Sequence, residues 1–100
     1  MSLGKADLAA TTLTTIYTVT AGKVGTCNVS ICNRNSSAVT VRLAIAAAAT
    51  PTASEWLEYD TSIAGNSTLE RSGVVAQSTE KIVAYSSATN VNVQVYGFED

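Results

Sequence analysis

The chain of 100 residues is long enough for one domain and too short for two hydrophobic cores. Only 14% of its residues are charged, its net charge is −2, and it contains no histidine. This charge balance argues against nucleic acid or an anionic membrane as a partner, and the missing histidine removes the commonest general base and transition-metal ligand. We therefore expect a protein that is not an enzyme, has no cofactor or metal, and binds neither nucleic acid nor a membrane.

The apolar residues, 46% of the chain, are mostly Ala and Val, while Trp, Phe, Met and Pro occur once each. A core of small and β-branched side chains favours strands. Residues 1–8 lack the unbroken apolar run of a secretory signal. No segment reaches the roughly 18 apolar residues of a transmembrane helix, so we expect the chain to be made and kept in a cytoplasm.

Apolar and polar residues alternate with a period of two along most of the chain, which is typical of half-buried strands. The predicted strands cover residues 13–19, 27–32, 39–46, 56–60, 68–75, 81–86 and 90–99. Turn-forming residues separate them, and Pro51 would stop a helix that began in the alanine run at 46–49. This pattern predicts an all-β fold, an antiparallel β-sandwich of Greek-key or jelly-roll type with about seven or eight strands.

The phase of the alternation predicts which side chains face the core. In the strand at 39–46, those expected to face inward are Val39, Val41, Leu43 and Ile45, and those expected to face outward are Thr40, Arg42, Ala44 and Ala46.

Residues 2–11 show no clear alternation, which makes residues 1–12 the segment outside the predicted pattern. We expect them to form an N-terminal arm outside a sandwich that covers residues 13–100. Leu3 and Leu8 would then be the apolar contacts of this arm with a neighbouring chain, each contributing roughly 1.5–3 kcal/mol if fully buried.

Cys27 and Cys32 lie on one predicted strand. An extended strand would separate their α-carbons by roughly 16 Å and point the two side chains to opposite faces. A disulfide needs α-carbons about 4.4–6.8 Å apart. We therefore expect two free thiols, with Cys27 packed as a small core residue.

Glu55, Glu58 and Asp60 form the densest acidic cluster, beside Trp56 and Tyr59. Alternation would place Glu58 and Asp60 on one face, about 7 Å apart, a spacing suited to glycoside hydrolysis or to calcium binding. The Gly-plus-Asx loop of a dedicated calcium site is missing. A solvated or partner-facing surface is therefore the favoured interpretation.

Two further residues are candidates for partner contacts. Arg42 is expected to face solvent, or to pair with an interface group or a cross-strand acid such as Glu58. Trp56, the only tryptophan, is expected to fill the core or an edge, with a role as interface anchor as the alternative.

Five segments occur in an order and spacing that resemble a known group of proteins: IYTVTAGK at 16–23, ICNR at 31–34, VRLAI at 41–45, LEYDT at 57–61 and NVNV at 90–93. The chain resembles small β-sandwich virion proteins of tailed bacteriophages over about residues 13–98. In that group a YTVPAGK turn leads to a CNR loop and later to a YLEYD strand. Thr20 replaces the usual Pro, and Ser78–Glu80 replaces an Ala-Gly-Asp turn.

The resemblance implies a structural role in the virion, most directly as a capsid decoration (cement) protein on the outer shell, with a tail or fibre-attachment component as the alternative. Its partners would be the major capsid protein or other virion proteins. The uncharged strands at 13–19 and 91–96 favour a homo-oligomer. The resemblance implies a trimer, because decoration proteins commonly lie at local three-fold positions of the shell. A rival from another class is a carbohydrate-binding module, with Trp56, Tyr59 and the nearby carboxylates as the sugar platform.

Overall fold

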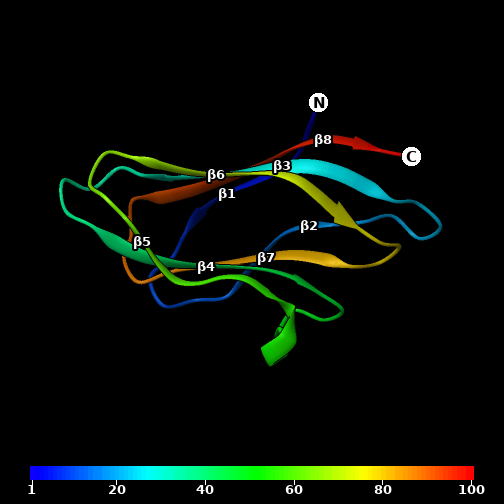
Figure 1. Ribbon diagram of the computed structural model, residues 1–100, viewed down its shortest axis with the longest axis horizontal. Helices are drawn as coiled ribbons and strands as arrows, with labels where there is room; N and C mark the ends of the chain where they lie inside the picture. Colours follow the sequence, from blue (N-terminus) through cyan, green and yellow to red (C-terminus); the bar gives the residue numbers. More distant parts are fainter.

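The computed structural model describes residues 1–100 as two four-stranded antiparallel sheets packed face to face (Figure 1). Sheet A contains, in spatial order, β1 (Ser2–Leu8), β8 (Val91–Glu99), β3 (Gly25–Asn33) and β6 (Thr68–Ala76). Sheet B contains β2 (Thr14–Thr18), β7 (Lys81–Ser86), β4 (Val39–Ala46) and β5 (Trp56–Ile63). The one helical element is a 3₁₀ turn, η1 (Ala53–Glu55), and no helix has the length and apolar character that crossing a membrane requires.

The order of the strands is that of a jelly roll. The chain passes from one sheet to the other at every connection except the β4–β5 hairpin, which stays within sheet B. Two Greek keys folded over each other produce this order. The predicted antiparallel sandwich is confirmed, and the seven predicted strands end within three residues of the observed limits.

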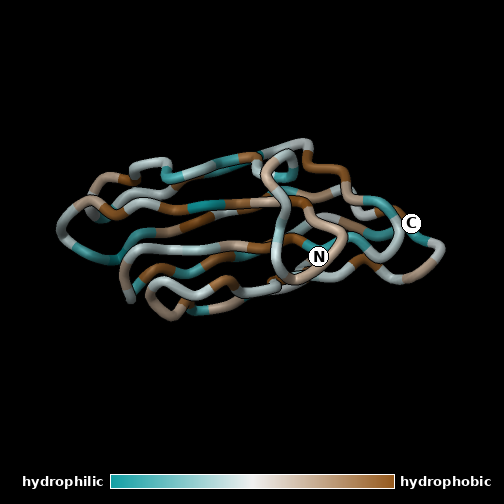
Figure 2. Tube along the Cα trace, turned by 90° about the horizontal axis from the view of Figure 1, so that it is seen from below, coloured by the Kyte–Doolittle hydropathy of each residue, from teal (hydrophilic) through white to brown (hydrophobic).

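The core fills the space between the inward faces of the two sheets. Ile31, Leu43 and Val93 are fully buried there, together with other Val, Ile and Ala side chains. Each fully buried side chain of this size contributes about 1.5–3 kcal/mol. Hydrophobic and hydrophilic positions alternate along several strands (Figure 2), and the hydrophobic positions on the inward faces supply this core.

The prediction of an N-terminal arm is wrong for the segment that forms β1. Residues 2–8 pair antiparallel with β8, and Leu8 lies opposite Val91 with 3% of its surface exposed. Leu3 is partly buried against the same core. Beyond β1, Ala10 bridges to Ser86 and Thr11 donates a backbone hydrogen bond to it. The segment is therefore part of the sandwich, and Leu8 cannot contact a partner.

The inward positions of β1 include the small residues Gly4 and Ala6, so this strand lacks the alternation of large apolar and polar residues that predicts a strand. A Cβ atom at Gly4 would collide with the backbone carbonyl oxygen of Ile16, so β1 needs glycine where it passes closest to β2. Together β1 and β2 close one side of the sandwich. On the other side, Arg71 of β6 forms an ion pair with Glu58 of β5. The two uncharged strands differ in position, because β8 lies between β1 and β3 and is no edge of its sheet, whereas β2 is an edge strand.

The predicted phase of β4 is right, but two of its outward residues are not solvated. Ala44 and Ala46 lie on the side opposite Val41 and Leu43, and yet they have no exposed surface. Segment 47–55 projects from sheet B away from sheet A (Figure 1), and η1 contacts β4. The small outward side chains of Ala44 and Ala46 therefore leave room for η1 to contact β4.

The strand prediction through the two cysteines is confirmed. β3 contains both, with Cys27 buried in the core and Cys32 half-buried on the opposite face, and both thiols are free. Burial raises the pKa of the Cys27 thiol, which keeps it protonated and unreactive.

Candidate functional site

A β-bulge in the β4–β5 hairpin shapes the outer face of sheet B. Val41 pairs with Thr61 and Leu43 pairs with Glu58, so Tyr59 and Asp60 both lie opposite Arg42. Asp60 has a φ of 52°, in the left-handed region that non-glycine residues seldom adopt. A bulge of this kind redirects a side chain that simple alternation would place elsewhere.

The bulge assembles a group that we call the arginine clamp, which consists of Arg42, Tyr59, Asp60 and Tyr85. The Nε and Nη2 atoms of Arg42 donate to the two carboxylate oxygens of Asp60 at 2.6 and 3.3 Å. Its guanidinium carbon lies 4.2 Å from the ring centroid of Tyr59 and 4.6 Å from that of Tyr85. The hydrogen bond that Arg42 donates to Asp60 raises the pKa of Arg42, so the clamp carries a permanent cation between two aromatic rings.

Trp56 extends the clamp toward η1. Its ring meets that of Tyr59 edge to face, with centroids 5.3 Å apart and planes at 70°. Ala53, Trp56 and Tyr59 line an open hollow of about 290 Å³. Trp56 is half-buried and Tyr59 is 56% exposed, so the aromatic surface is accessible from solvent.

The three clustered carboxylates point to three different partners. Glu55 accepts hydrogen bonds from the backbone N–H groups of Thr52 (2.8 Å) and Ala47 (3.0 Å), which lower its pKa. Glu58 binds Arg71 and accepts a hydrogen bond from the Thr61 hydroxyl. Asp60 binds Arg42. The predicted common face for Glu58 and Asp60 is wrong because the bulge breaks the alternation, and no group of three carboxylates converges on a cation position.

A second surface lies on the outer face of sheet A. Thr26 of β3 pairs with Val75 of β6 on one side and with Phe98 of β8 on the other. Val75 is 47% exposed and Phe98 is 64% exposed, and we call these two residues the apolar row. Met1 lies beside the row, because its carbonyl accepts a hydrogen bond from the backbone N–H of Gly97.

Around Arg34, the loops that follow β3 and β5 and the loop that precedes β8 are joined by a hydrogen-bonded network at one end of the sandwich, which we call the loop end. The buried Asn33 side chain donates to the carbonyls of Ser37, Ile63 and Ala64 at 3.0–3.2 Å, which joins two loops. Its oxygen accepts from Asn35, whose own amide donates to the carbonyl of Thr89 in a third loop.

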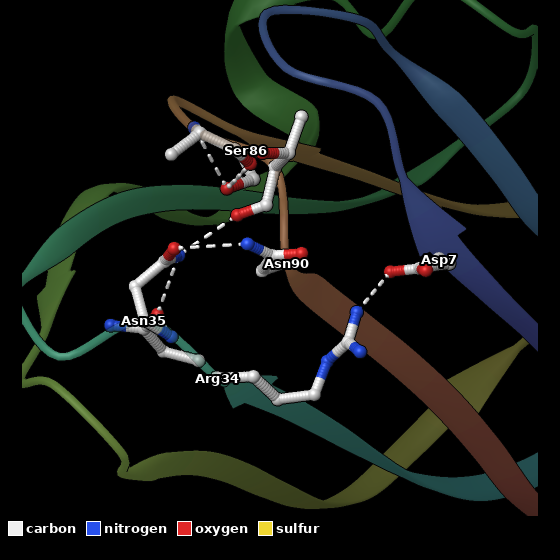
Figure 3. Close-up of polar contacts among 8 residues, drawn as sticks. Asp7, Arg34, Asn35, Ser86 and Asn90 are labelled. Carbon is white, nitrogen blue, oxygen red and sulfur yellow. Dashed lines mark hydrogen bonds and ion pairs between the residues drawn. The ribbon is translucent and has the colours of Figure 1, made fainter.

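Figure 3 shows the outer part of this network. Asn35 and Asn90 point toward one another, and Arg34 reaches across to Asp7. Lys5, Asp7, Arg34, Asn92 and Gln94 border a shallow hollow of about 420 Å³. Because the polar groups of the loop end form hydrogen bonds and an ion pair with one another, we assign this end of the molecule a structural role.

The predicted partner residues thus divide into two groups. Arg42 and Trp56 lie on one accessible face, and Arg42 forms a cross-strand pair with Asp60 rather than with Glu58. Leu8 belongs to the core and Leu3 packs against it. The sequence analysis missed Tyr85, Val75 and Phe98. The pair Val74-Val75 breaks strict alternation, and this was the one signal that could have indicated Val75.

Comparisons with protein-family models, with curated proteins and with solved structures found no match to this chain.

Proposed function

We propose that this chain is a structural protein of a bacteriophage virion, a capsid decoration protein that binds the outer shell through the apolar row of sheet A. The sequence resemblance supports the virion assignment. The jelly-roll order supports it by analogy, because the same architecture is common in viral capsid domains as well as in lectins and cupins. The observation that carries the docking surface is the exposure of Phe98 and Val75 on one rigid sheet face.

The centre of this face, around Thr26, has the apolar character of an interface centre, because its two paired neighbours are Val75 and Phe98. Phe is enriched in the centres of interfaces and charged residues are depleted there. Along β3, the pairs of Thr26 are apolar, whereas Ser30 pairs with Gln94 and Glu70. Thr26 and Ser30 are four residues apart on β3, which corresponds to about 13 Å along the strand. The Glu70 carboxylate and the Gln94 amide therefore lie beyond the apolar centre, where they can form part of a polar rim.

The face is formed before any partner binds. Its side chains project from four paired strands, so docking would order little backbone and lose little conformational entropy. The partner in this proposal is the major capsid protein. The resemblance to decoration proteins extends the proposal to three copies around a local three-fold position of the shell.

The experiment is co-sedimentation of the purified protein with undecorated capsids of the phage that encodes it. We expect the wild type to sediment with the capsids and Phe98→Ser to lose at least about tenfold in affinity, a loss of about 1.4 kcal/mol. Tyr59→Ser is the matched control, because it removes an exposed aromatic ring from the opposite sheet.

Two results would overturn the proposal: a wild-type protein that does not bind capsids, or a Phe98→Ser variant that binds as well as the wild type. Binding to purified tails in place of capsids would favour the tail component.

A further inference from the structure

We infer that the outer face of sheet B binds a hexopyranose unit of a neutral glycan, in the hollow bordered by Ala53, Trp56 and Tyr59 and beside the arginine clamp. This inference goes beyond the decoration role, because it concerns the opposite face of the sandwich and a different class of ligand.

The walls of the hollow suit one sugar ring. Trp56 and Tyr59 stand with their planes at 70° and their centroids 5.3 Å apart, which makes an aromatic corner. The hollow of about 290 Å³ is lined only by these two rings and Ala53. The C–H faces of a pyranose are apolar and pack on aromatic rings, and small-molecule sites are commonly apolar with a few polar groups that fix orientation.

The clamp supplies such polar groups next to the aromatic corner. A guanidinium has five N–H donors in a planar fork, and Asp60 accepts from only two of its nitrogens. The side chain of Asp60 is 47% exposed and that of Arg42 is 26% exposed. A sugar hydroxyl both donates and accepts, so an exposed donor beside an exposed acceptor matches a pair of neighbouring hydroxyls.

The charge of the clamp selects a neutral ligand. Arg42 and Asp60 compensate each other in a bidentate pair, so a sulfate or phosphate group would meet the Asp60 carboxylate as well as the guanidinium. A neutral hydroxyl meets no such repulsion.

The clamp is also held in position before a ligand arrives. Arg42 is fixed by Asp60 on one side and by the rings of Tyr59 and Tyr85 on its faces. Asp60 keeps its left-handed φ of 52° because the β4–β5 pairing holds the bulge on both sides. Backbone strain of this kind is concentrated at binding and catalytic sites. A fixed platform loses little side-chain entropy on binding.

The only tryptophan of the chain lies in this hollow, so its fluorescence reports on the site directly. The probes are the methyl glycosides of glucose, mannose and galactose, together with maltotriose, and glucose 6-sulfate is the charged comparison. With at least one neutral probe we expect a saturable change in Trp56 fluorescence at millimolar concentration. Tyr59→Ala should weaken this binding about tenfold and Arg42→Lys should weaken it severalfold, because lysine keeps the charge and loses the planar fork.

Phe98→Ser is the matched control, since it removes an exposed aromatic ring from sheet A and should leave sugar binding unchanged. Circular dichroism of each variant checks that the sandwich is retained. No saturable change with any neutral probe would overturn the inference, as would unchanged binding by Tyr59→Ala. Binding of the sulfated sugar alone would contradict the neutral class. A fluorescence change that depends on protein concentration without sugar would assign the hollow to a second copy of the chain.

Discussion

The side chain of Asn33 connects several loops of the molecule through hydrogen bonds. It is fully buried, and its amide group serves three carbonyl oxygens while its oxygen accepts from Asn35. We predict that Asn33→Ala lowers the free energy of unfolding by about 3 kcal/mol or more, because each buried group left without a partner costs about 1–3 kcal/mol. Urea denaturation measures the change.

The matched control for that variant is Asn92→Ala. Asn92 is half-buried on the outer face of sheet A, and its side chain makes no hydrogen bond within the chain. Surface substitutions of this kind change stability by about 0.5 kcal/mol or less. Equal losses for the two variants would show that the Asn33 network does not hold the loops together.

Tyr17 gives the molecule a pH dependence on the alkaline side. Burial, and then the neighbouring Glu99 carboxylate, raise the pKa of its phenol from 10 to about 12, and no hydrogen-bond partner meets its hydroxyl with good geometry. Below pH 10 both the folded and the unfolded chain keep the proton. Between pH 10 and about 12 the unfolded chain loses it first, so the free energy of unfolding falls as pH rises.

We therefore predict that Tyr17→Phe changes stability little at pH 7 and reduces the loss of stability between pH 10 and 12. Thermal unfolding of both proteins across this range measures the difference. Tyr96 remains in the variant and titrates in the same direction, because its hydrogen bond to Glu70 raises its pKa. Identical alkaline profiles would mean that the Tyr17 phenol is not held in its protonated form by the fold.

At the scale of elements, β1 is the strand that the sequence pattern did not predict, because residues 1–12 were expected to form an arm outside the sandwich. Leu8 is buried opposite Val91, so Leu8→Ala should lower the free energy of unfolding by about 2–5 kcal/mol. Leu13→Ala is the control, because Leu13 is 37% exposed and should cost less than about 1 kcal/mol. If residues 1–12 were a free arm, Leu8→Ala would instead be as stable as the wild type, and chemical denaturation distinguishes the two cases.

The strands could be predicted because period-two alternation is a local property of the sequence. β4 and β7 begin and end where the pattern indicates, and in β4 the inward face is marked by Val39, Val41 and Leu43. β1 could not be predicted, because its inward positions include Gly4 and Ala6, whose small size fits a close crossing of β2 rather than a hydrophobic face.

The candidate site could be predicted only in part. The alternation of β4 indicated Arg42, and composition indicated Trp56. The shift that places Tyr59 and Asp60 opposite Arg42 depends on a left-handed residue within β5, which neither signal shows. A shift of one residue moves side chains to the other face of a sheet. Tyr85 joins the clamp through pairing between strands far apart in the chain, which alternation alone does not indicate.

At the scale of the whole molecule, the two sheets present outer faces of different chemistry. Sheet A carries exposed Phe98 and Val75, and sheet B carries the arginine clamp and the aromatic hollow. The β1–β2 side and the β5–β6 side are each closed by contacts between the sheets. A protein docked through sheet A would therefore present the clamp to the surroundings of the particle.

The most direct test of this account is the location and orientation of the chain in the virion, measured by cryo-electron microscopy of the assembled particle. We expect density for the sandwich on the outside of the capsid, with Phe98 and Val75 against the major capsid protein and Arg42 facing solvent. Density confined to the tail, or a capsid-bound copy with the clamp against the shell, would contradict it.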